Sequence, residues 1–387
     1  MTEETANRSV YLDGHATTPL APEASEAMSP WWSSFAANAN SPHVLGQRAA
    51  AAVEKARSQI AQLVDVAPSE IVFTSGATEA NNLALLGIAG LFAPNDSERR
   101  NIVVSAIEHK SVLAVASELG RRGWEIRIAP VDRNGRLSVE MFAEMVDERT
   151  LLASVMAANN EIGTIQPLAD VLSICRNSGA MIHVDAAQSV GKIPTSFPDV
   201  DFASISSHKM YGPPGVGALF VSSAAPFKPR PLFFGGSQES GLRPGTLPVP
   251  LIVGFGAAAA SRIASMEKDA SRTEKLREHL LEGLRRRQVR FMINGDRTER
   301  LPGSLNIRVL NVDAMELIMR LGERVLVAEG SACSSGNIAP SHVLTAIGLS
   351  AEEASCSIRM FISRFNTVDD MEVAAEQIAL AAGAIRQ

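Results

Sequence analysis

The feature that most constrains the fold is a regular alternation of two kinds of segment between residues 70 and 222. Seven short runs rich in β-branched residues predict strands, at 70–76, 101–107, 125–131, 151–157, 181–186, 201–207 and 216–222. Helical spacing of apolar residues predicts four helices between them, at 78–91, 110–121, 137–147 and 167–177. Such alternation is typical of an α/β fold with a mostly parallel, helix-covered sheet, whose strand ends carry the ligand site.

The length of the chain predicts two domains. Its 387 residues exceed the usual size of one domain. Residues 249–287 form an apolar helical pattern that continues into a charged one, a change typical of a domain edge. We therefore predict a large domain over residues 15–262 and a smaller α/β domain formed by 1–14 and 263–387. The smaller domain has three predicted strands, at 304–309, 324–328 and 357–362.

The charge and hydropathy patterns exclude several partners. The chain has 36 basic and 42 acidic residues, a net charge of −6, which argues against a basic surface that binds nucleic acid. Residues 1–8 contain two glutamates and no apolar core, so a secretory signal is not predicted. The apolar run at 83–93 is shorter than the roughly 20 residues that a membrane helix needs. We expect a cytoplasmic protein without a nucleic-acid or membrane partner.

The three cysteines predict neither a disulfide framework nor a zinc knuckle, because they are odd in number and form no C-x-x-C pair. Cys175 lies in a helical pattern and Cys356 precedes a strand, so both are expected to be buried. Cys333 lies among small residues in GSACSSG, a composition that favours a mobile, partly exposed loop. Thiol chemistry requires that kind of access.

The segment FTSGATEANN, residues 73–82, predicts an anion site. A strand ends in a glycine-containing turn, and Thr78 is the predicted N-cap of the following helix. Free backbone N–H groups and the helix dipole at such a position suit a phosphate. A helix that is capped without binding a ligand is the alternative. A Walker loop is excluded, because Ala186 lies five residues before Gly191-Lys192, where that motif has glycine.

The segment HVDAAQSVGK, residues 183–192, places Asp185 at the end of a strand and Gln188 three residues later. A carboxylate at this edge of a sheet can hold the protonated ring nitrogen of a ligand. His183 and Asp185 could instead be two ligands of a metal, but no third ligand is evident nearby, so no metal site is predicted. An aspartate that only caps the strand end towards solvent is the third interpretation.

The segment SSHKMYGPPGVGAL, residues 206–219, brings Lys209 into a turn rich in glycine and proline. A lysine among apolar neighbours has a lowered pKa and can bond covalently to an aldehyde cofactor. An exposed turn lysine is the alternative interpretation. Only 24 residues separate Asp185 from Lys209, which is room for one strand return, so both are expected at the same sheet edge.

With these motifs, the chain resembles the pyridoxal-phosphate enzymes of aminotransferase class V, and within them the cysteine desulfurases. The ordered motifs span almost the whole chain, which makes the resemblance specific. Besides the segments quoted above they are YLDGHATTPLAP (11–22), NSPHVLGQ (40–47), EHKSV (108–112), NNEIGTIQP (159–167), GLRPGTLPV (241–249) and SIRMFISRF (357–365). The resemblance implies the aminotransferase-like fold, fold type I, and pyridoxal 5'-phosphate as cofactor.

The resemblance also implies roles for the residues of a cofactor site. Lys209 bonds to the cofactor, Asp185 holds its pyridine nitrogen, Gln188 donates to its phenolic oxygen, and His109 stacks on the ring and moves protons. The other implied contacts bind the phosphate or lie beside it: Ala77, Thr78, Ser206, His208 and, from the neighbouring subunit of a homodimer, Thr246.

The resemblance further implies the reaction. Asn160 and Arg359 bind the substrate carboxylate, with Arg364 a rival for Arg359. L-cysteine is converted to L-alanine, and Cys333 takes the sulfur as a persulfide. A sulfur-acceptor protein, an iron–sulfur scaffold or another sulfur carrier, then removes it. The alternatives are a selenocysteine lyase, another class V lyase or aminotransferase, and a non-enzymatic scaffold of the same fold.

Five positions depart from the family pattern. Ser237 and Ser240 replace a glycine and an arginine, which bears on the local dimer contact. Phe361 and Ser363 replace a serine and a glycine, which bears on the pocket around the substrate carboxylate. Glu329 occupies a position that is commonly small, where its charge would raise the pKa of Cys333.

Overall fold

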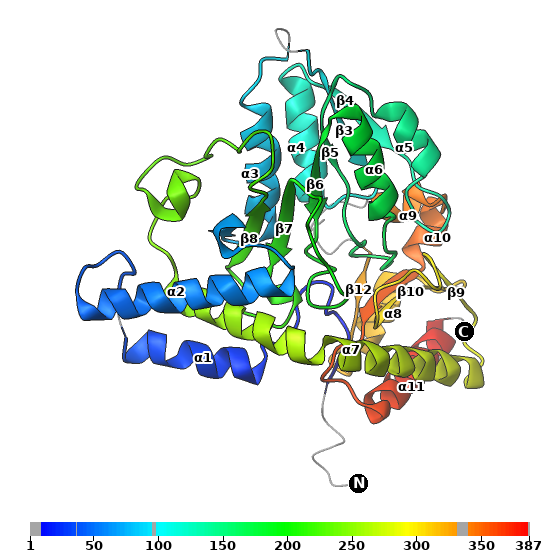
Figure 1. Cartoon of the computed structure of the whole chain (residues 1–387). Helices are drawn as coiled ribbons and strands as arrows, with labels where there is room; N and C mark the ends of the chain where they lie inside the picture. The colour runs from blue at the N-terminus through cyan, green and yellow to red at the C-terminus, as the bar shows by residue number, and fades with distance from the viewer. Residues whose placement is uncertain (1–8, 36, 95–97, 331–339, 386–387) are drawn as a thin grey trace.

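The centre of the molecule is a seven-stranded sheet with the strand order β2-β8-β7-β6-β5-β3-β4 (Figure 1). The computed structural model describes residues 9–35, 37–94, 98–330 and 340–385. The strands are β2 (Ile71–Thr74), β3 (Asn101–Ser105), β4 (Glu125–Ala129), β5 (Thr150–Ser154), β6 (Met181–Asp185), β7 (Phe202–Ser206) and β8 (Gly217–Val221). β8 pairs antiparallel with both of its neighbours, β2 and β7, and the other four strand pairs are parallel. All seven predicted strands and the mostly parallel arrangement are confirmed.

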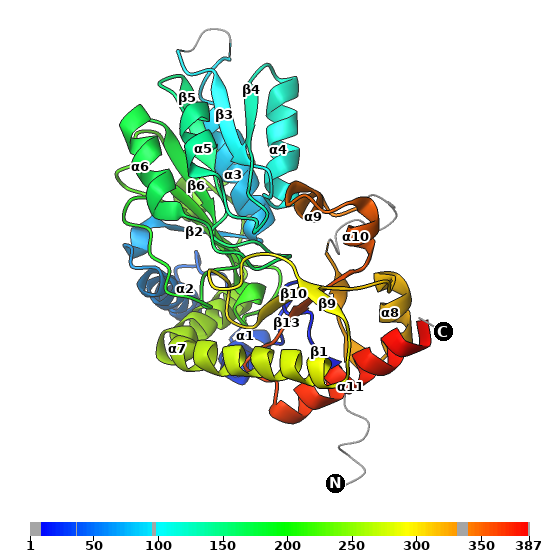
Figure 2. The same cartoon turned by 90° about the vertical axis from the view of Figure 1, so that its right-hand side faces the viewer.

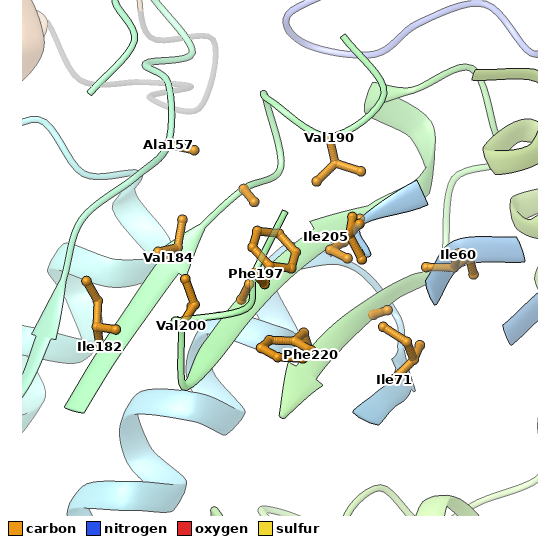
Figure 3. Close-up of a cluster of buried hydrophobic side chains, with 14 of the residues drawn as sticks. Ile60, Ile71, Ala157, Ile182, Val184, Val190, Phe197, Val200, Ile205 and Phe220 are labelled. Atoms are coloured by element: carbon orange, nitrogen blue, oxygen red, sulfur yellow. The ribbon is translucent and has the colours of Figure 1, made fainter. Parts of the chain in front are cut away.

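Helices cover both faces of this sheet, and each face has its own apolar core. One face packs against α3 (Ala77–Ala89) and α4 (Lys110–Arg121). The other packs against α2 (Val44–Leu63), α5 (Val139–Met145), α6 (Leu168–Ser178) and the start of α7 (Val249–Arg286). Figure 3 shows part of this second core, where Ile60 of α2 lies near strand side chains such as Ile205 and Phe220. The four predicted helices are therefore confirmed.

The start of α3 differs from the prediction, because Gly76 is the N-cap and Thr78 lies inside the first turn. Gly76 has φ 152°, a conformation that L side chains rarely adopt. Its backbone also lies against β8, since a Cβ on Gly217 would come within 2.6 Å of the Gly76 Cα. A close backbone approach therefore determines where this helix begins, in place of a side-chain cap.

The C-terminal part of the chain forms a second, antiparallel sheet with the order β12-β13-β10-β9. Its strands are β9 (Phe291–Ile293), β10 (Ser304–Val309), β12 (Ala328–Glu329) and β13 (Ser357–Phe361). Four helices follow or flank them, α8 (Ala314–Leu321), α9 (His342–Ala346), α10 (Ala351–Ser355) and α11 (Val368–Ile385). The predicted strands at 304–309 and 357–362 are confirmed.

The strand predicted at 324–328 divides between two partners. β11 (Val325–Leu326) pairs in parallel with β1 (Val10–Tyr11), whereas β12 pairs with β13. The side chains of Val10 and Leu12 are buried in the same apolar core as β10 and β13. The N-terminal segment therefore packs on the C-terminal part of the chain.

One helix of 38 residues, α7, connects the two parts (Figure 2). Its residues up to Ala259 belong to the core of the large sheet, and those from Leu276 belong to the C-terminal core. The predicted boundary near residue 262 falls inside this continuous helix, where Arg262 is buried and bonds to Gly191 O and Asp269. The division into 15–262 and 1–14 with 263–387 stays a prediction.

Helix α7 is also the one helix among the described residues whose length and composition would suffice to cross a membrane. In this structure 44% of its most apolar window is buried. It packs against α1 (Pro22–Ser33), α2 and α11.

The close approach of Gly76 and Gly217 leads to a stability prediction. A Cβ on Gly217 would also lie 2.5 Å from Ile205 O, so Gly217→Ala should lower the free energy of unfolding by about 1–3 kcal/mol, as overpacking does. Urea unfolding followed by circular dichroism measures the change. Gly383→Ala in α11 is the matched control, because its Cβ would meet nothing within 4 Å and should stabilise by about 0.5 kcal/mol. Equal stability of wild type and Gly217→Ala would contradict the argument.

Candidate active site

A cavity of about 390 Å³ lies at the carboxyl ends of β6 and β7. It collects ten of the predicted site residues: Ala77, Thr78, His109, Asn160, Asp185, Gln188, Ser206, His208, Lys209 and Arg359. Two larger surface hollows, of about 760 and 730 Å³, contain none of them. Chemistry rather than size therefore identifies the candidate site.

Lys209 lies at the end of a single 3₁₀ turn, η3 (Ser207–Lys209), that follows β7. Its Nζ donates to the backbone oxygens of His15 at 2.6 Å and Ala16 at 2.5 Å. Thr18 fastens the same N-terminal segment to the turn, because its N–H and its hydroxyl both donate to His208 O at 2.9 Å. The lysine amine is thus held in the cavity, and the interpretation as an exposed turn lysine is wrong.

Asp185 is connected to His109 through two side chains that were not predicted. Asn81 Nδ2 donates to Asp185 Oδ2 and to Ser111 Oγ, each at 2.8 Å. Ser111 then meets His109 Nδ1 twice, through its hydroxyl at 2.7 Å and its backbone N–H at 3.1 Å. Asn81 and Ser111 lie within the motifs at 73–82 and 108–112, but only the packing of α3 on α4 brings them together.

The state of the His109 ring follows from these bonds. Nδ1 accepts from the backbone N–H of Ser111, so a proton on the neutral ring belongs to Nε2. Burial lowers the pKa of His109, and the charge of Lys209 lowers it further, although Asp185 acts in the opposite direction. A neutral imidazole is therefore favoured beside the cavity.

A second group of residues around the cavity suits an anion. The backbone N–H groups of Ala77 and Thr78 lie in the first turn of α3 and have no intrahelical acceptor. Ser206, at the end of β7, and His208 line the same cavity. Burial lowers the pKa of His208 to about 4, so it is a neutral hydrogen-bonding group at pH 7. The four phosphate contacts predicted within this chain thus line one cavity.

Arg359 enters the cavity from β13, the sheet of the C-terminal part. Its Nη2 donates to Asp13 Oδ1 at 2.9 Å, and its Nη1 donates to Gly330 O at 3.2 Å and Asn160 O at 3.4 Å. Its Nε is buried and finds no acceptor among the described residues. A guanidinium fixed in this way can bind a ligand carboxylate.

Arg364, the predicted rival of Arg359, lies elsewhere. It donates to Glu23 at 2.6 Å and to Ser261, and its guanidinium lies over the rings of Tyr211 and Phe365. It is not among the residues that line the cavity. The packing therefore favours Arg359 as the carboxylate contact.

Besides Asn81 and Ser111, the sequence analysis missed two further residues in or beside the site, His15 and Lys192. The buried ring of His15 bonds through Nδ1 to Gln188 Oε1 at 3.1 Å and through Nε2 to Ser304 Oγ at 2.8 Å. Lys192 Nζ donates to the same oxygen of Gln188 at 2.6 Å. Both residues lie in quoted motifs, but no spacing rule distinguishes them from their neighbours.

The two-ligand metal interpretation of His183 is wrong. Its Nδ1 bonds to Ser154 Oγ at 2.8 Å and its Nε2 to Ser204 Oγ at 2.9 Å, so both ring nitrogens are already used. The ring is fully buried below Asp185 on β6, and burial lowers its pKa to about 4. His183 joins three neighbouring strands of the sheet.

Thr246 lies outside the cavity and is exposed. The turn before it, η4 (Gln238–Gly241), is anchored by Glu239, which pairs with Arg57 at 2.8 Å and accepts from Phe73 N at 2.7 Å. The role of Thr246 in a neighbouring subunit stays a prediction.

The three cysteines have different outcomes. Cys333 lies outside the described residues. Cys175 is buried as predicted, and burial raises its pKa to about 12. The prediction that Cys356 is buried is wrong, because it lies half-buried at the end of α10, where the chain turns into β13.

The departures from the family pattern have definite places. The Phe361 ring lies 4.5 Å from Lys192 Nζ and 4.9 Å from the His15 ring, and a Cβ on Gly14 would come within 2.4 Å of it. Phe361 therefore fills the space that Gly14 leaves. Ser363 bonds to Asn366 at 3.0 Å.

None of the five departures is among the residues that line the cavity. Ser237 precedes η4, and Ser240 within that turn adopts the left-handed φ of 56°. Burial raises the pKa of Glu329, and the charge of Asp313 raises it further.

These features together define a class: an α/β protein with the aminotransferase-like fold, in which a lysine and an aspartate face one cavity at the carboxyl edge of a mostly parallel sheet. The chain belongs to the aminotransferase class-V family, whose sequence pattern matches residues 10–373.

Several known proteins are similar to the chain along nearly its whole length. Cysteine desulfurase IscS of Rickettsia felis is 41% identical, over 96% of this chain and 90% of that protein. The enzyme of the same name from Rickettsia typhi is 42% identical, over 95% and 90%. A solved NifS-like protein superposes with a TM-score of 0.89 at 36% identity, covering 96% of this chain and 99% of that one. A structure described as SspA in complex with cysteine has a TM-score of 0.80 at 35% identity, covering 93% and 100%.

The buried His183 predicts a pH dependence of stability. Its pKa is about 4 when folded and about 6.5 when unfolded, so between these values the unfolded chain binds the extra proton and stability falls as the pH falls. In His183→Gln, whose amide can still bond the two serines, this contribution is absent. From pH 7 to pH 5 the variant should lose about 2 kcal/mol less unfolding free energy than wild type. Urea unfolding at both pH values is the measurement, and equal losses in the two proteins would refute the assignment.

Proposed function

We propose that the protein is a pyridoxal-phosphate-dependent cysteine desulfurase. It converts L-cysteine to L-alanine and transfers the sulfur through a persulfide on Cys333 to an acceptor. The observation that carries the proposal is that Lys209, Asp185 and Arg359 face one cavity. Membership of the class V family and relatives that are named cysteine desulfurases support it.

The residues around the cavity fit pyridoxal 5'-phosphate. Lys209 supplies the amine for its aldehyde, and Asp185 supplies a carboxylate for a protonated ring nitrogen. The N–H groups of Ala77 and Thr78 suit its phosphate, and Gly76 leaves the approach to them free of a side chain. When bound, the cofactor supplies an electron sink that stabilises negative charge at the substrate Cα.

Different side chains of the cavity bind the substrate and transfer its protons. The Arg359 fork binds the carboxylate, beside Asn160. Lys209 Nζ takes the proton from the substrate Cα and later returns it. His109, with its proton on Nε2, lines the cavity, where it would stack on the cofactor ring and could pass a proton.

The sulfur transfer is a displacement on sulfur. The Cys333 thiolate attacks the substrate sulfur, an S–S bond forms, and the C–S electron pair stays with the substrate carbon, which takes up a proton to give L-alanine. A thiol of the acceptor then removes the terminal sulfur by exchange. The assignment of Cys333 rests on its sequence motif.

The proposal includes a setting for this reaction. A homodimer brings Thr246 of the neighbouring subunit to the phosphate, for which its exposed position is suited. The acceptor is an iron–sulfur scaffold or another sulfur-carrier protein, and the compartment is the cytoplasm. A selenocysteine lyase or another class V lyase or aminotransferase would use the same cofactor residues, but the named relatives favour the desulfurase.

The proposed nucleophile, Cys333, can be tested directly. Purified wild type should be yellow and should release alanine and sulfide from L-cysteine in the presence of a reductant. Cys333→Ala should keep the same visible spectrum and release neither product above about 1% of the wild-type rate, because the nucleophile is lost. Amino-acid analysis and sulfide assay measure the products.

Cys175→Ala is the matched control, because its thiol is buried away from the cavity and should leave turnover within about twofold of wild type. Equal turnover of wild type and Cys333→Ala would reject the persulfide route. A colourless wild type that gains no colour with added cofactor would reject the cofactor assignment.

The proposed carboxylate contact, Arg359, can be tested in the same assay. Arg359→Lys keeps the charge but loses the fork, so kcat/KM for L-cysteine should fall about 10- to 100-fold, mainly through KM. Arg364→Lys, outside the cavity, should stay within about threefold of wild type. Steady-state kinetics with L-cysteine measure kcat/KM for both variants. A larger loss in Arg364→Lys than in Arg359→Lys would assign the carboxylate contact to Arg364.

A further inference from the structure

Lys192 is a buried lysine that the proposed reaction does not use. Its residue is 6% exposed, and its Nζ lies 4.5 Å from the centre of the Phe361 ring. Among the described residues no carboxylate lies within ion-pair distance of it. Its amine donates instead to Gln188 Oε1 at 2.6 Å. Burying an amine without an acid partner is costly, so the hydrogen bond to Gln188 calls for a functional explanation.

The bond to Lys192 fixes the orientation of the Gln188 amide. An amine on lysine donates and a glutamine oxygen accepts, so the atom facing Lys192 is Oε1. His15 Nδ1 contacts the same oxygen at 3.1 Å, and Gln188 Nε2 donates to His15 O at 3.1 Å. One N–H of Nε2 is thereby used, and the second is left for the cavity that Gln188 lines.

The ring of His15 completes this arrangement. Because Oε1 of Gln188 can only accept, His15 Nδ1 carries the proton, and its Nε2 accepts from the Ser304 hydroxyl at 2.8 Å. Burial lowers the pKa of His15 well below its usual range, and Lys192 lowers it further, which preserves this neutral form. A chain of donors from Ser304 thus ends on the Gln188 oxygen.

We infer that Lys192 is a positioning residue that holds and polarises the Gln188 amide, so that its remaining N–H donates strongly to an anionic oxygen in the cavity. Under the proposed function, on which this inference rests, that oxygen is the phenolic oxygen of the cofactor. Two donors on Oε1 withdraw electron density from the amide and strengthen its N–H as a donor. Lys192 itself does not line the cavity and acts through Gln188.

The groups around Lys192 determine which property of the amine matters. Lys209 and Arg359 are the basic side chains whose charges act on the pKa of Lys192. Lys192 in turn lowers the pKa of His15 and of His208. Burial lowers the pKa of Lys192 well below its usual range, and the charges of Lys209 and Arg359 add to this effect. An amine donates an N–H whether or not it is protonated, so the hydrogen bond is the feature that the site retains.

The inference predicts a change in the visible titration of the bound cofactor. A weaker Gln188 donor stabilises the anionic oxygen less, so the deprotonated chromophore is disfavoured and its pKa rises. In the holoenzyme, Lys192→Met and Lys192→Leu should each raise the pH midpoint of the absorbance change by about 0.5 to 1 unit. Lys192→Gln, which keeps an N–H donor, should stay within about 0.3 unit of wild type.

A double-mutant cycle separates this role from a structural one. In a Gln188→Leu background, Lys192→Met should add no further shift, because the group through which Lys192 acts is gone. Lys268→Met, an exposed lysine on α7, is the control and should leave the midpoint unchanged. The measurement is a spectrophotometric pH titration without substrate, so it does not depend on turnover.

The outcomes are distinct. A shift by Lys192→Met that is as large without Gln188 as with it would mean that Lys192 acts on the cofactor directly, and would overturn the inference. An unchanged midpoint in Lys192→Met or in Lys192→Leu would also overturn the inference. Both variants remove the donor and keep an apolar side chain against Phe361. If one of them fails to fold, the other still tests the inference. A wild type without a titratable visible band would instead reject the proposed function.

Discussion

The site depends on the segment from Val10 to Thr18, which ties the two parts of the molecule together. Val10 pairs with β11, and Leu12 O accepts from Phe361 N at 2.7 Å. The next residues supply Asp13 to Arg359 and two backbone oxygens to Lys209. The same stretch therefore positions the lysine at the end of β7 and the arginine on β13. Two residues of one cavity, supplied by the two parts of the molecule, are thus held by a single segment.

Burial shifts the pKa values of several titratable groups in and around the cavity. It raises the pKa of Glu108 well above its usual range and raises that of Glu161, while it lowers the pKa of the three histidines that line the cavity, His15, His109 and His208. In each case burial disfavours the charged form of the group. Arg359 lines the same cavity, where its guanidinium is fixed by Asp13 Oδ1, Gly330 O and Asn160 O.

Much of this arrangement could be read from the chain. The seven strands of the large sheet follow from their β-branched runs, and the carboxyl-edge position of Asp185 and Lys209 follows from the parallel topology. The prediction of Thr78 as the cap of α3 was wrong, because a backbone contact between Gly76 and Gly217 governs that turn and they are 141 residues apart, 217 minus 76. Likewise, the sequence at 324–328 predicts one strand, but its first part, β11, pairs with β1 and its last residue belongs to β12, which pairs with β13.

The sequence by itself determined the α/β class, the order of the elements and the residue types that the site contains, since periodicity and motif spacing are local properties of the chain. Only the tertiary structure decided that Arg359 rather than Arg364 faces the cavity, that both nitrogens of His183 bond to serines, and that Lys192 bonds to Gln188. Each of these depends on a contact made by packing. A side chain's partners are set by which elements meet in space, and residue spacing along the chain does not encode that.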